Sequence, residues 1–167
     1  DLTRLLVGSE GTLAVITELT LRVFGIPEKM AAAIVRFETL ADGVTAATAI
    51  VRSGIAIARC EFLDAKCIKN VNAHDGLSLA EVPTLFFEFH GSPAGVAEDA
   101  ASVKSIVEEF GGSQFEWTTD EGARRKLWQA RHNAYWAGIA ANPGKRAVST
   151  DAAVPLSKLS DAVAVAD

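Results

Sequence analysis

The regular alternation of short apolar strands with amphipathic helices is the feature that most restricts the fold of this chain. The strongest strand pattern covers residues 84–90, a run rich in aromatic side chains. Patterns of both kinds follow one another along the sequence: strands over 31–38, 56–63, 84–90 and 113–118, and helices over 40–53, 64–73 and 94–110. Apart from the short helix over 64–73, the order is βαββαβ, which predicts an α+β fold, a ferredoxin-like antiparallel sheet with helices on one face.

Composition limits the classes of protein that remain. The chain has 167 residues, of which 49% are hydrophobic, so it can bury one core. Charged residues interrupt every apolar run before it reaches 18 residues, so the sequence predicts no transmembrane segment. The net charge of -5 argues against nucleic acid as a partner. Cys60 and Cys67 have no metal-site or disulfide spacing, and we expect ordinary thiols in a reducing, cytoplasmic location.

Near the N-terminus, an apolar run leads into a turn with Gly8 and Gly11 and then into a second apolar, β-branched run. The pattern predicts a strand, a tight turn and a second strand, with glycines that let the backbone approach a flat or anionic ligand. It is neither a P-loop, because no Lys follows Gly11, nor a dinucleotide fingerprint, which requires a third glycine. An ordinary hairpin is the alternative.

A long helix is predicted over residues 120–141. One arc of this helix is mostly apolar, with Ala123, Leu127, Ala130, Ala134, Tyr135 and Gly138. Arg131 falls in the middle of that arc, and a guanidinium there must find an anion. The anion is either the carboxylate of a bound substrate, which suits the planar fork of arginine, or a sheet acid such as Glu61 or Glu88.

Two blocks of sequence resemble a known family. They are Leu5-Leu6-Val7-Gly8-Ser9-Glu10-Gly11-Thr12-Leu13 with Ile16-Thr17-Glu18, and Leu127-Trp128-Gln129-Ala130-Arg131-His132-Asn133-Ala134 followed by Pro143-Gly144, Ser149-Thr150-Asp151 and Val154-Pro155-Leu156. In residues, order and spacing they resemble FAD-linked oxidases of the vanillyl-alcohol-oxidase superfamily, in the D-lactate dehydrogenase and glycolate oxidase branch. The resemblance covers essentially the whole chain.

The resemblance implies that residues 1–26 are the end of the FAD-binding domain. Residues 27–167 would then be the C-terminal substrate domain, truncated at its C-terminal end. It implies a fragment of an FAD-dependent 2-hydroxy-acid dehydrogenase, which forms the 2-oxo acid with hydride transfer to flavin. We expect the fragment alone to be inactive, because the family's base and divalent-metal ligands lie beyond it. A non-catalytic ferredoxin-like binding or interaction domain is the alternative.

The resemblance also implies roles for individual residues. Arg131 would anchor the substrate carboxylate, and Arg146 would add a second positive charge over the flavin unless it is a solvated loop cation. No metal ligand is expected within the chain. The residues expected to bind FAD are Gly8, Ser9, Glu10, Gly11, Thr12, Ala14, Val15 and Ile16. Ala14 stands where relatives usually have glycine.

The expected partners are a small 2-hydroxy acid and an unidentified electron acceptor. If that acceptor lies in a membrane, the otherwise cytoplasmic protein would associate with the membrane surface through it. Residues 1–26 are expected to be the weak end of the chain, because strands taken from another domain's sheet lose their partners. Such strands pair readily with a second chain, so we also expect a homodimer.

Overall fold

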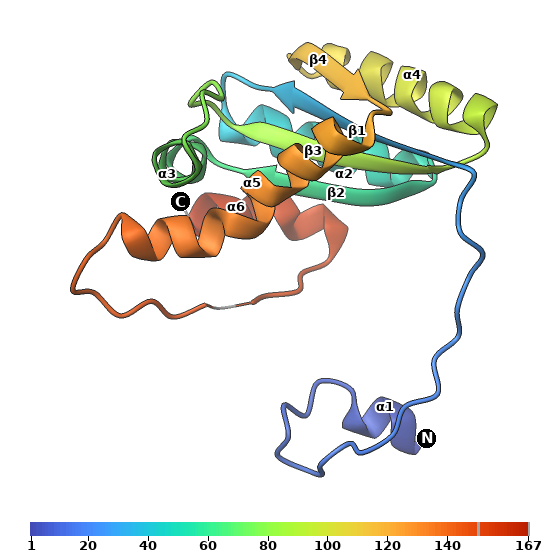
Figure 1. Cartoon of the computed structure of the whole chain (residues 1–167), viewed down its shortest axis with the longest axis vertical. Helices are drawn as coiled ribbons and strands as arrows, with labels where there is room; N and C mark the ends of the chain where they lie inside the picture. Colours follow the sequence, from blue (N-terminus) through green and yellow to red (C-terminus); the bar gives the residue numbers. More distant parts are fainter. Residues whose placement is uncertain (150, 167) are drawn as a thin grey trace.

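A four-stranded antiparallel sheet lies at the centre of the computed structural model, which describes residues 1–149 and 151–166. The strands are β1 (Lys29–Arg36), β2 (Ile57–Leu63), β3 (Thr84–Gly91) and β4 (Ser113–Thr118). Their spatial order is β2-β3-β1-β4, with β1 and β3 in the middle (Figure 1). The order and the antiparallel pairing are those of a ferredoxin-like sheet, so the predicted fold class is confirmed.

The helices begin and end where local sequence signals place them. The main helices are α2 (Leu40–Ser53), α3 (Ala65–Asp75), α4 (Pro93–Glu109) and α5 (Glu121–Ala140), and the shorter ones are α1 (Leu2–Leu6), η1 (Leu156–Lys158) and α6 (Leu159–Ala166). Each main helix starts at a Thr, Asp or Ser whose side chain accepts a backbone N–H in the first turn. Gly54 and Gly76, with φ of 74° and 65°, end α2 and α3 in the left-handed conformation.

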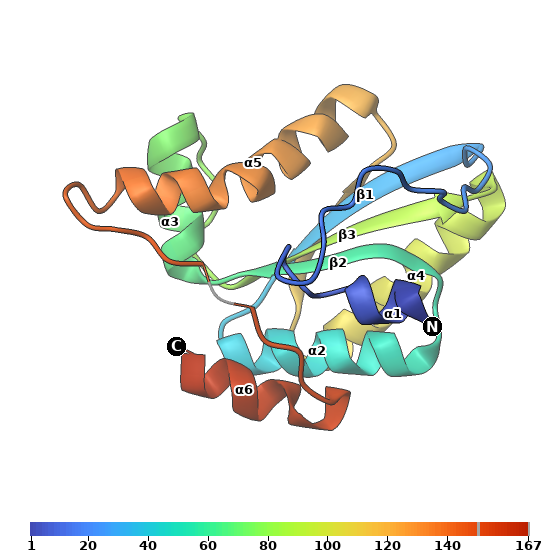
Figure 2. The same ribbon diagram turned by 90° about the horizontal axis from the view of Figure 1, so that it is seen from below.

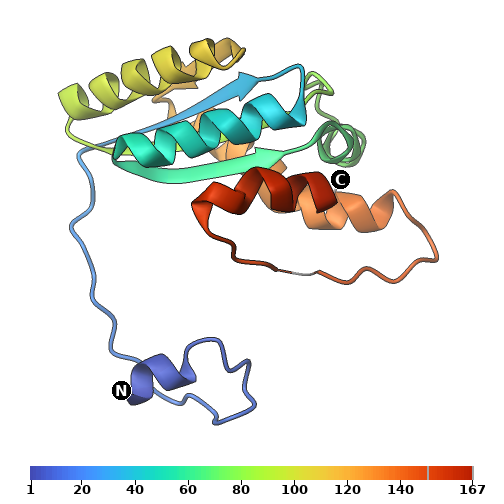
Figure 3. The same ribbon diagram turned by 180° about the vertical axis from the view of Figure 1, so that it is seen from behind.

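Two helices cover each face of the sheet. On one face, α2 and α4 pack against side chains such as Val35, Phe87 and Phe89 to form the largest core (Figure 3). On the other face, α5 packs against the sheet, and α3 lies beside it (Figure 2). The helices α2 and α4 thus form the single helical layer that the ferredoxin-like prediction expected. The second face is covered as well, because β1 and β3 carry apolar side chains on both sides, as central strands do.

The prediction of a strand–turn–strand at the N-terminus is wrong. Residues 2–6 form the short helix α1, and residues 14–27 form neither helix nor strand. This segment extends away from the sheet domain (Figure 1). A strand is stabilised by hydrogen bonds to a neighbouring strand, and no strand of the described chain lies beside residues 14–27. Apolar alternation alone therefore does not fix β structure here.

Candidate functional site

Helix α5 lies across the second face of the sheet and carries the predicted anchor. Trp128 is its deepest large side chain, 7% exposed, and its ring packs on that of Phe86 in β3, with 6.4 Å between centroids. Arg131 follows one helical turn later, so it is held on the same side of the helix near the edge strand β2. The packing of Trp128 thus fixes where the backbone of Arg131 stands.

An irregularity in β2 decides which side chains of this strand face α5. The pairing with β3 shifts by one residue between Ile57, opposite Phe89, and Arg59, opposite Glu88. Because side chains alternate along a strand, a one-residue shift moves every later side chain to the opposite face. Ile57 packs into the α2 and α4 core, whereas Arg59 and Glu61 lie on the α5 face.

Arg131 forms an ion pair with Glu61. Its Nε donates to Glu61 Oε2 at 2.9 Å, and its Nη2 lies 2.7 Å from the same oxygen. Within the described residues, Nη1 has no partner, and the Arg131 side chain is 35% exposed. One edge of the guanidinium is therefore occupied by a protein carboxylate, and the other remains free to receive a second one.

Glu88, the other predicted partner of Arg131, has different neighbours. It is 5% exposed, and its Oε1 lies 2.6 Å from His90 Nε2 and 3.7 Å from Arg59 Nε. The guanidinium of Arg59 also lies over the ring of Trp128, 5.0 Å from its centroid. Arg59 and Trp128 were not predicted as site residues. Trp128 was visible only as part of a sequence block, and Arg59 reaches α5 only through the shift in β2.

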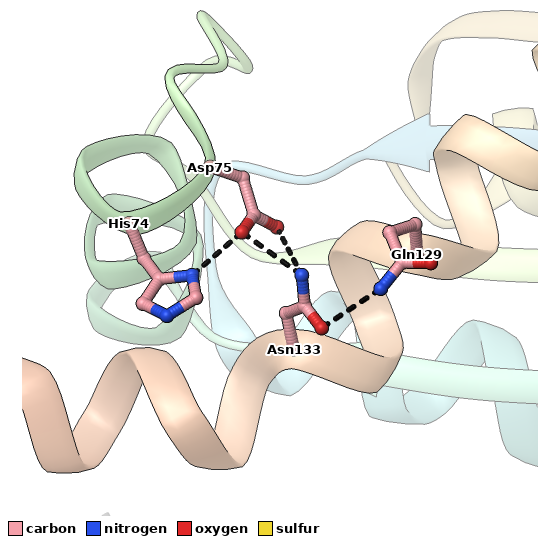
Figure 4. A network of polar contacts seen from close by, with 4 residues as sticks. All are labelled: His74, Asp75, Gln129 and Asn133. Carbon is pink, nitrogen blue, oxygen red and sulfur yellow. Dashed lines mark hydrogen bonds and ion pairs between the residues drawn. The ribbon is translucent and has the colours of Figure 1, made fainter.

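A polar cluster fixes α5 against α3 (Figure 4). Asn133 Nδ2 donates to both carboxylate oxygens of Asp75, at 2.9 and 3.0 Å, and its Oδ1 accepts from Gln129 at 2.9 Å. His74 Nδ1 lies 2.6 Å from Asp75 Oδ1. Asp75 is the last residue of α3, so the cluster sets the position of α5 and with it that of Arg131.

Arg146, the second predicted cation, lies in the exposed segment between α5 and η1. In the described part of the chain, nothing joins Arg146 to Arg131 or to an acid. The structure therefore does not bring the two predicted arginines into contact. Thr150, which belongs to the second sequence block, lies outside the described residues.

The predicted FAD-binding residues line one open hollow of about 500 Å³. They all contribute to it except Thr12, whose side chain instead donates to Ser9 O at 2.6 Å. Gly8 and Gly11 have φ of 82° and 78°, and a Cβ at either would meet nothing within 4 Å. The hollow is lined mostly by apolar or small residues, and its one charged residue is Glu10. These residues therefore fit the edge of a flat ring better than a phosphate.

The remaining chemistry-bearing groups are few. Among residues 1–149 and 151–166, no three His, Cys, Asp or Glu side chains are placed to hold a metal ion. No helix in this part is long and apolar enough to cross a membrane. Burial, with a smaller contribution from Glu61, raises the pKa of Cys60 to about 11, and burial together with Asp64 raises the pKa of Cys67 to about 11. Both are therefore neutral thiols near pH 7.

Comparison with known proteins identifies the family. Residues 26–167 match the family described as FAD linked oxidases, C-terminal domain. A probable mitochondrial D-lactate dehydrogenase of Danio rerio is 46% identical over 95% of this chain and 32% of its own length. A mitochondrial D-lactate dehydrogenase [cytochrome] of Arabidopsis thaliana is 43% identical over 98% of this chain and 29% of its own length. The chain thus spans about a third of these relatives.

More distant similarities agree. The glycolate oxidase subunit GlcD of Escherichia coli K12 is 28% identical over 81% of this chain and 28% of its own length. A solved alkyldihydroxyacetonephosphate synthase superposes with a TM-score of 0.57 at 20% identity, over 78% of this chain and 27% of that one. At this identity the superposition supports the fold alone.

The comparisons correct one prediction and confirm another. The expected cytoplasmic location is wrong, since the D-lactate dehydrogenases of fish, plant and two yeasts that the chain matches are all named mitochondrial. Two free cysteines do not distinguish a reducing cytoplasm from other reducing compartments, so the sequence offered no basis for that choice. The predicted resemblance, in contrast, is confirmed over 142 of the 167 residues, 26–167. The chain belongs to the family of FAD-linked oxidase C-terminal domains.

Proposed function

We propose that the complete protein containing this chain is an FAD-dependent 2-hydroxy-acid dehydrogenase with D-lactate as its substrate. The relatives named D-lactate dehydrogenase are 32% to 46% identical, whereas those named glycolate oxidase subunits are 28% identical. D-Lactate is therefore preferred to glycolate. The family match also counts against a non-catalytic ferredoxin-like module.

The observation that carries this proposal is the half-free guanidinium of Arg131. Its Nε and Nη2 are held by Glu61, while Nη1 is unpaired in the described chain and the side chain is 35% exposed. A 2-hydroxy acid presents a carboxylate beside the carbon that is oxidised. Arg131 would hold that carboxylate through its free edge and orient the substrate, which is the main contribution a protein makes to cofactor chemistry.

Arg146 would supply a second positive charge. It is exposed and unpaired within the described chain, so it is available to a bound anion once the connection after α5 packs against a flavin domain. The proton of the substrate hydroxyl would pass to a base that the family resemblance places beyond this chain. Arg131 and Arg146 would therefore bind and orient the substrate without taking its proton.

Residues 1–26 would be the end of the FAD-binding domain, and residues 27–167 the substrate domain. The family match beginning at residue 26 and the extension of the N-terminal segment away from the sheet support this division. The backbone and small side chains from Gly8 to Ile16 would contact the cofactor. Bound FAD would supply the acceptor for the hydride that leaves C2 of the substrate.

The electron acceptor would be a cytochrome, because three of the matched D-lactate dehydrogenases carry that word in their names. The same names support a mitochondrial location for the complete protein. A homodimer stays a prediction that rests on the exposed apolar side chains of residues 1–26.

Anaerobic reduction of the flavin tests the activity. The complete protein, purified with FAD, is mixed without oxygen with D-lactate, L-lactate or glycolate. We expect D-lactate to bleach the flavin absorbance fastest and L-lactate to leave it unchanged. Bleaching by glycolate alone would overturn the choice of substrate, and no bleaching by any 2-hydroxy acid would overturn the proposed activity.

A further inference from the structure

We infer that Glu61 is a positioning residue for Arg131, holding one edge of the guanidinium so that the other edge faces the substrate carboxylate. This inference rests on the proposed function of Arg131. Its first support is the contact itself, because Nε and Nη2 of Arg131 both approach a single oxygen of Glu61, at 2.9 and 2.7 Å. One carboxylate oxygen thus fixes the edge of the guanidinium formed by Nε and Nη2, and Nη1 stays available to a bound carboxylate.

The second support is that both residues stand on fixed backbone. Glu61 lies directly opposite Phe86 in the sheet, and the ring of Trp128, one turn before Arg131, packs on Phe86. The guanidinium of Arg59 covers the Trp128 ring, which further confines α5. The contact between Phe86 and Trp128 therefore positions the backbone of both Glu61 and Arg131, which restricts the distance between the two side chains.

The third support comes from the exposure of the pair. Both side chains are more than a third exposed, and ion pairs so open to water contribute little to folding. Nevertheless, the one-residue shift in β2 turns Glu61 toward α5 and away from the opposite core. An arginine without a partner samples many rotamers, so the effect of Glu61 is to preorganise the fork for a ligand.

Glu61 also compensates the charge of Arg131. The pair has no net charge, so a substrate carboxylate gains from the geometry of the free N–H groups more than from the field of an isolated cation. Removing the whole Glu61 side chain should therefore weaken substrate binding, even though a negative charge disappears. Replacing the carboxylate by an amide keeps the acceptor oxygen and should preserve binding.

The test compares Glu61→Ala and Glu61→Gln in the complete FAD-loaded protein. We expect Glu61→Ala to raise the KM for D-lactate about tenfold, with kcat changed much less, and Glu61→Gln to stay within about threefold of the parent. Binding of oxalate, followed by calorimetry, should weaken in parallel. Glu116→Ala is the matched control, because Glu116 pairs with Arg36 at 2.8 Å near the opposite edge of the sheet.

A double variant separates this inference from the proposed function. If Glu61 acts through Arg131, adding Glu61→Ala to Arg131→Lys should produce no further loss. An unchanged KM and oxalate affinity in Glu61→Ala, in a protein where Arg131→Lys is impaired, would overturn the positioning role and leave the anchor intact. If Arg131→Lys itself binds oxalate and turns over D-lactate normally, the anchor role of Arg131 and the positioning role of Glu61 are both wrong, whereas the proposed activity stands.

Discussion

The N-terminal segment and the sheet domain are built from similarly apolar sequence, but only the sheet domain buries it. Val15 and Ile26 are 87% and 91% exposed, whereas Val35 and Phe87 are 0% exposed. The difference lies in partners, since β1 has a strand on each side and a helix layer on each face, and residues 14–27 have none in the described chain. Apolar residues thus indicate where a surface will be buried only when the covering element belongs to the same chain.

Substitutions in the central strands should change the free energy of unfolding most. Phe87→Ala should lower the free energy of unfolding by about 3–5 kcal/mol, because it removes a fully buried ring from the main core. Leu19→Ala, at a residue that is 66% exposed, should change it by less than about 0.5 kcal/mol. Urea denaturation measures both. Equal losses would show that the N-terminal segment folds onto the domain.

Thiol reactivity gives the next largest difference. With their pKa raised to about 11 from an ordinary 9.0, Cys60 and Cys67 should react about a hundredfold more slowly with iodoacetamide near pH 8 than a cysteine introduced by Thr20→Cys in the exposed segment. The raised pKa values also make stability depend on pH. The contribution of the two protonated thiols to the free energy of unfolding is fully present below pH 9 and is lost as the pH rises toward 11. Mass spectrometry over time measures the labelling. Equal rates at all three positions would mean that the domain opens readily.

Glycine replacement should show a smaller contrast. A Cβ at Gly112 would lie 2.7 Å from the carbonyl oxygen of Val107, which accepts the Gly112 N–H at the end of α4, so Gly112→Ala should destabilise the chain by about 1–3 kcal/mol. A Cβ at Gly25 would meet nothing within 4 Å. Gly25→Ala should therefore leave the thermal melting temperature unchanged. A larger loss for Gly25→Ala would contradict the open conformation of residues 14–27.

Removing residues 1–26 should have the smallest effect on folding. The segment has no part in the three core clusters, so the shortened chain should melt within about 2 °C of the 167-residue chain. If the exposed apolar residues cause self-association, the longer chain should elute as a dimer in gel filtration and the shorter one as a monomer. A monomer in both cases would contradict the predicted homodimer.

The sequence was sufficient for the fold of residues 29–140 because each element carries its own signal. β4 occupies the predicted residues 113–118, and α2 ends before Gly54 as expected. The buried face of α5 was predicted less well. Tyr135, placed on the apolar arc, is 47% exposed, whereas Trp128 and Ala137 are buried. A single apolar arc cannot predict the buried side of α5, because the first half of this helix packs on the sheet and the second half packs on α3.

The candidate site was only partly predictable. Sequence reasoning named Arg131 and offered Glu61 or Glu88 as its partner, but strict alternation from Ile57 would place Glu61 on the α2 and α4 side. The one-residue shift in β2 brings Glu61 to α5, and such a shift depends on packing between elements that no local pattern records. Arg59 was missed for the same reason.

The most direct measurement of the central claim is kcat/KM for D-lactate in Arg131→Lys of the complete protein, with Arg36→Lys as the control. Lysine keeps the charge but loses the planar fork, so we expect a loss of about 2–4 kcal/mol in transition-state binding, a drop of roughly thirty- to a thousand-fold. Arg36→Lys alters an ion pair that joins β1 to the edge strand β4 through Glu116 and includes neither Arg131 nor Glu61, so it should retain normal turnover. A lower melting temperature with unchanged kcat/KM in Arg131→Lys would instead make Arg131 a structural partner of Glu61 and contradict the account.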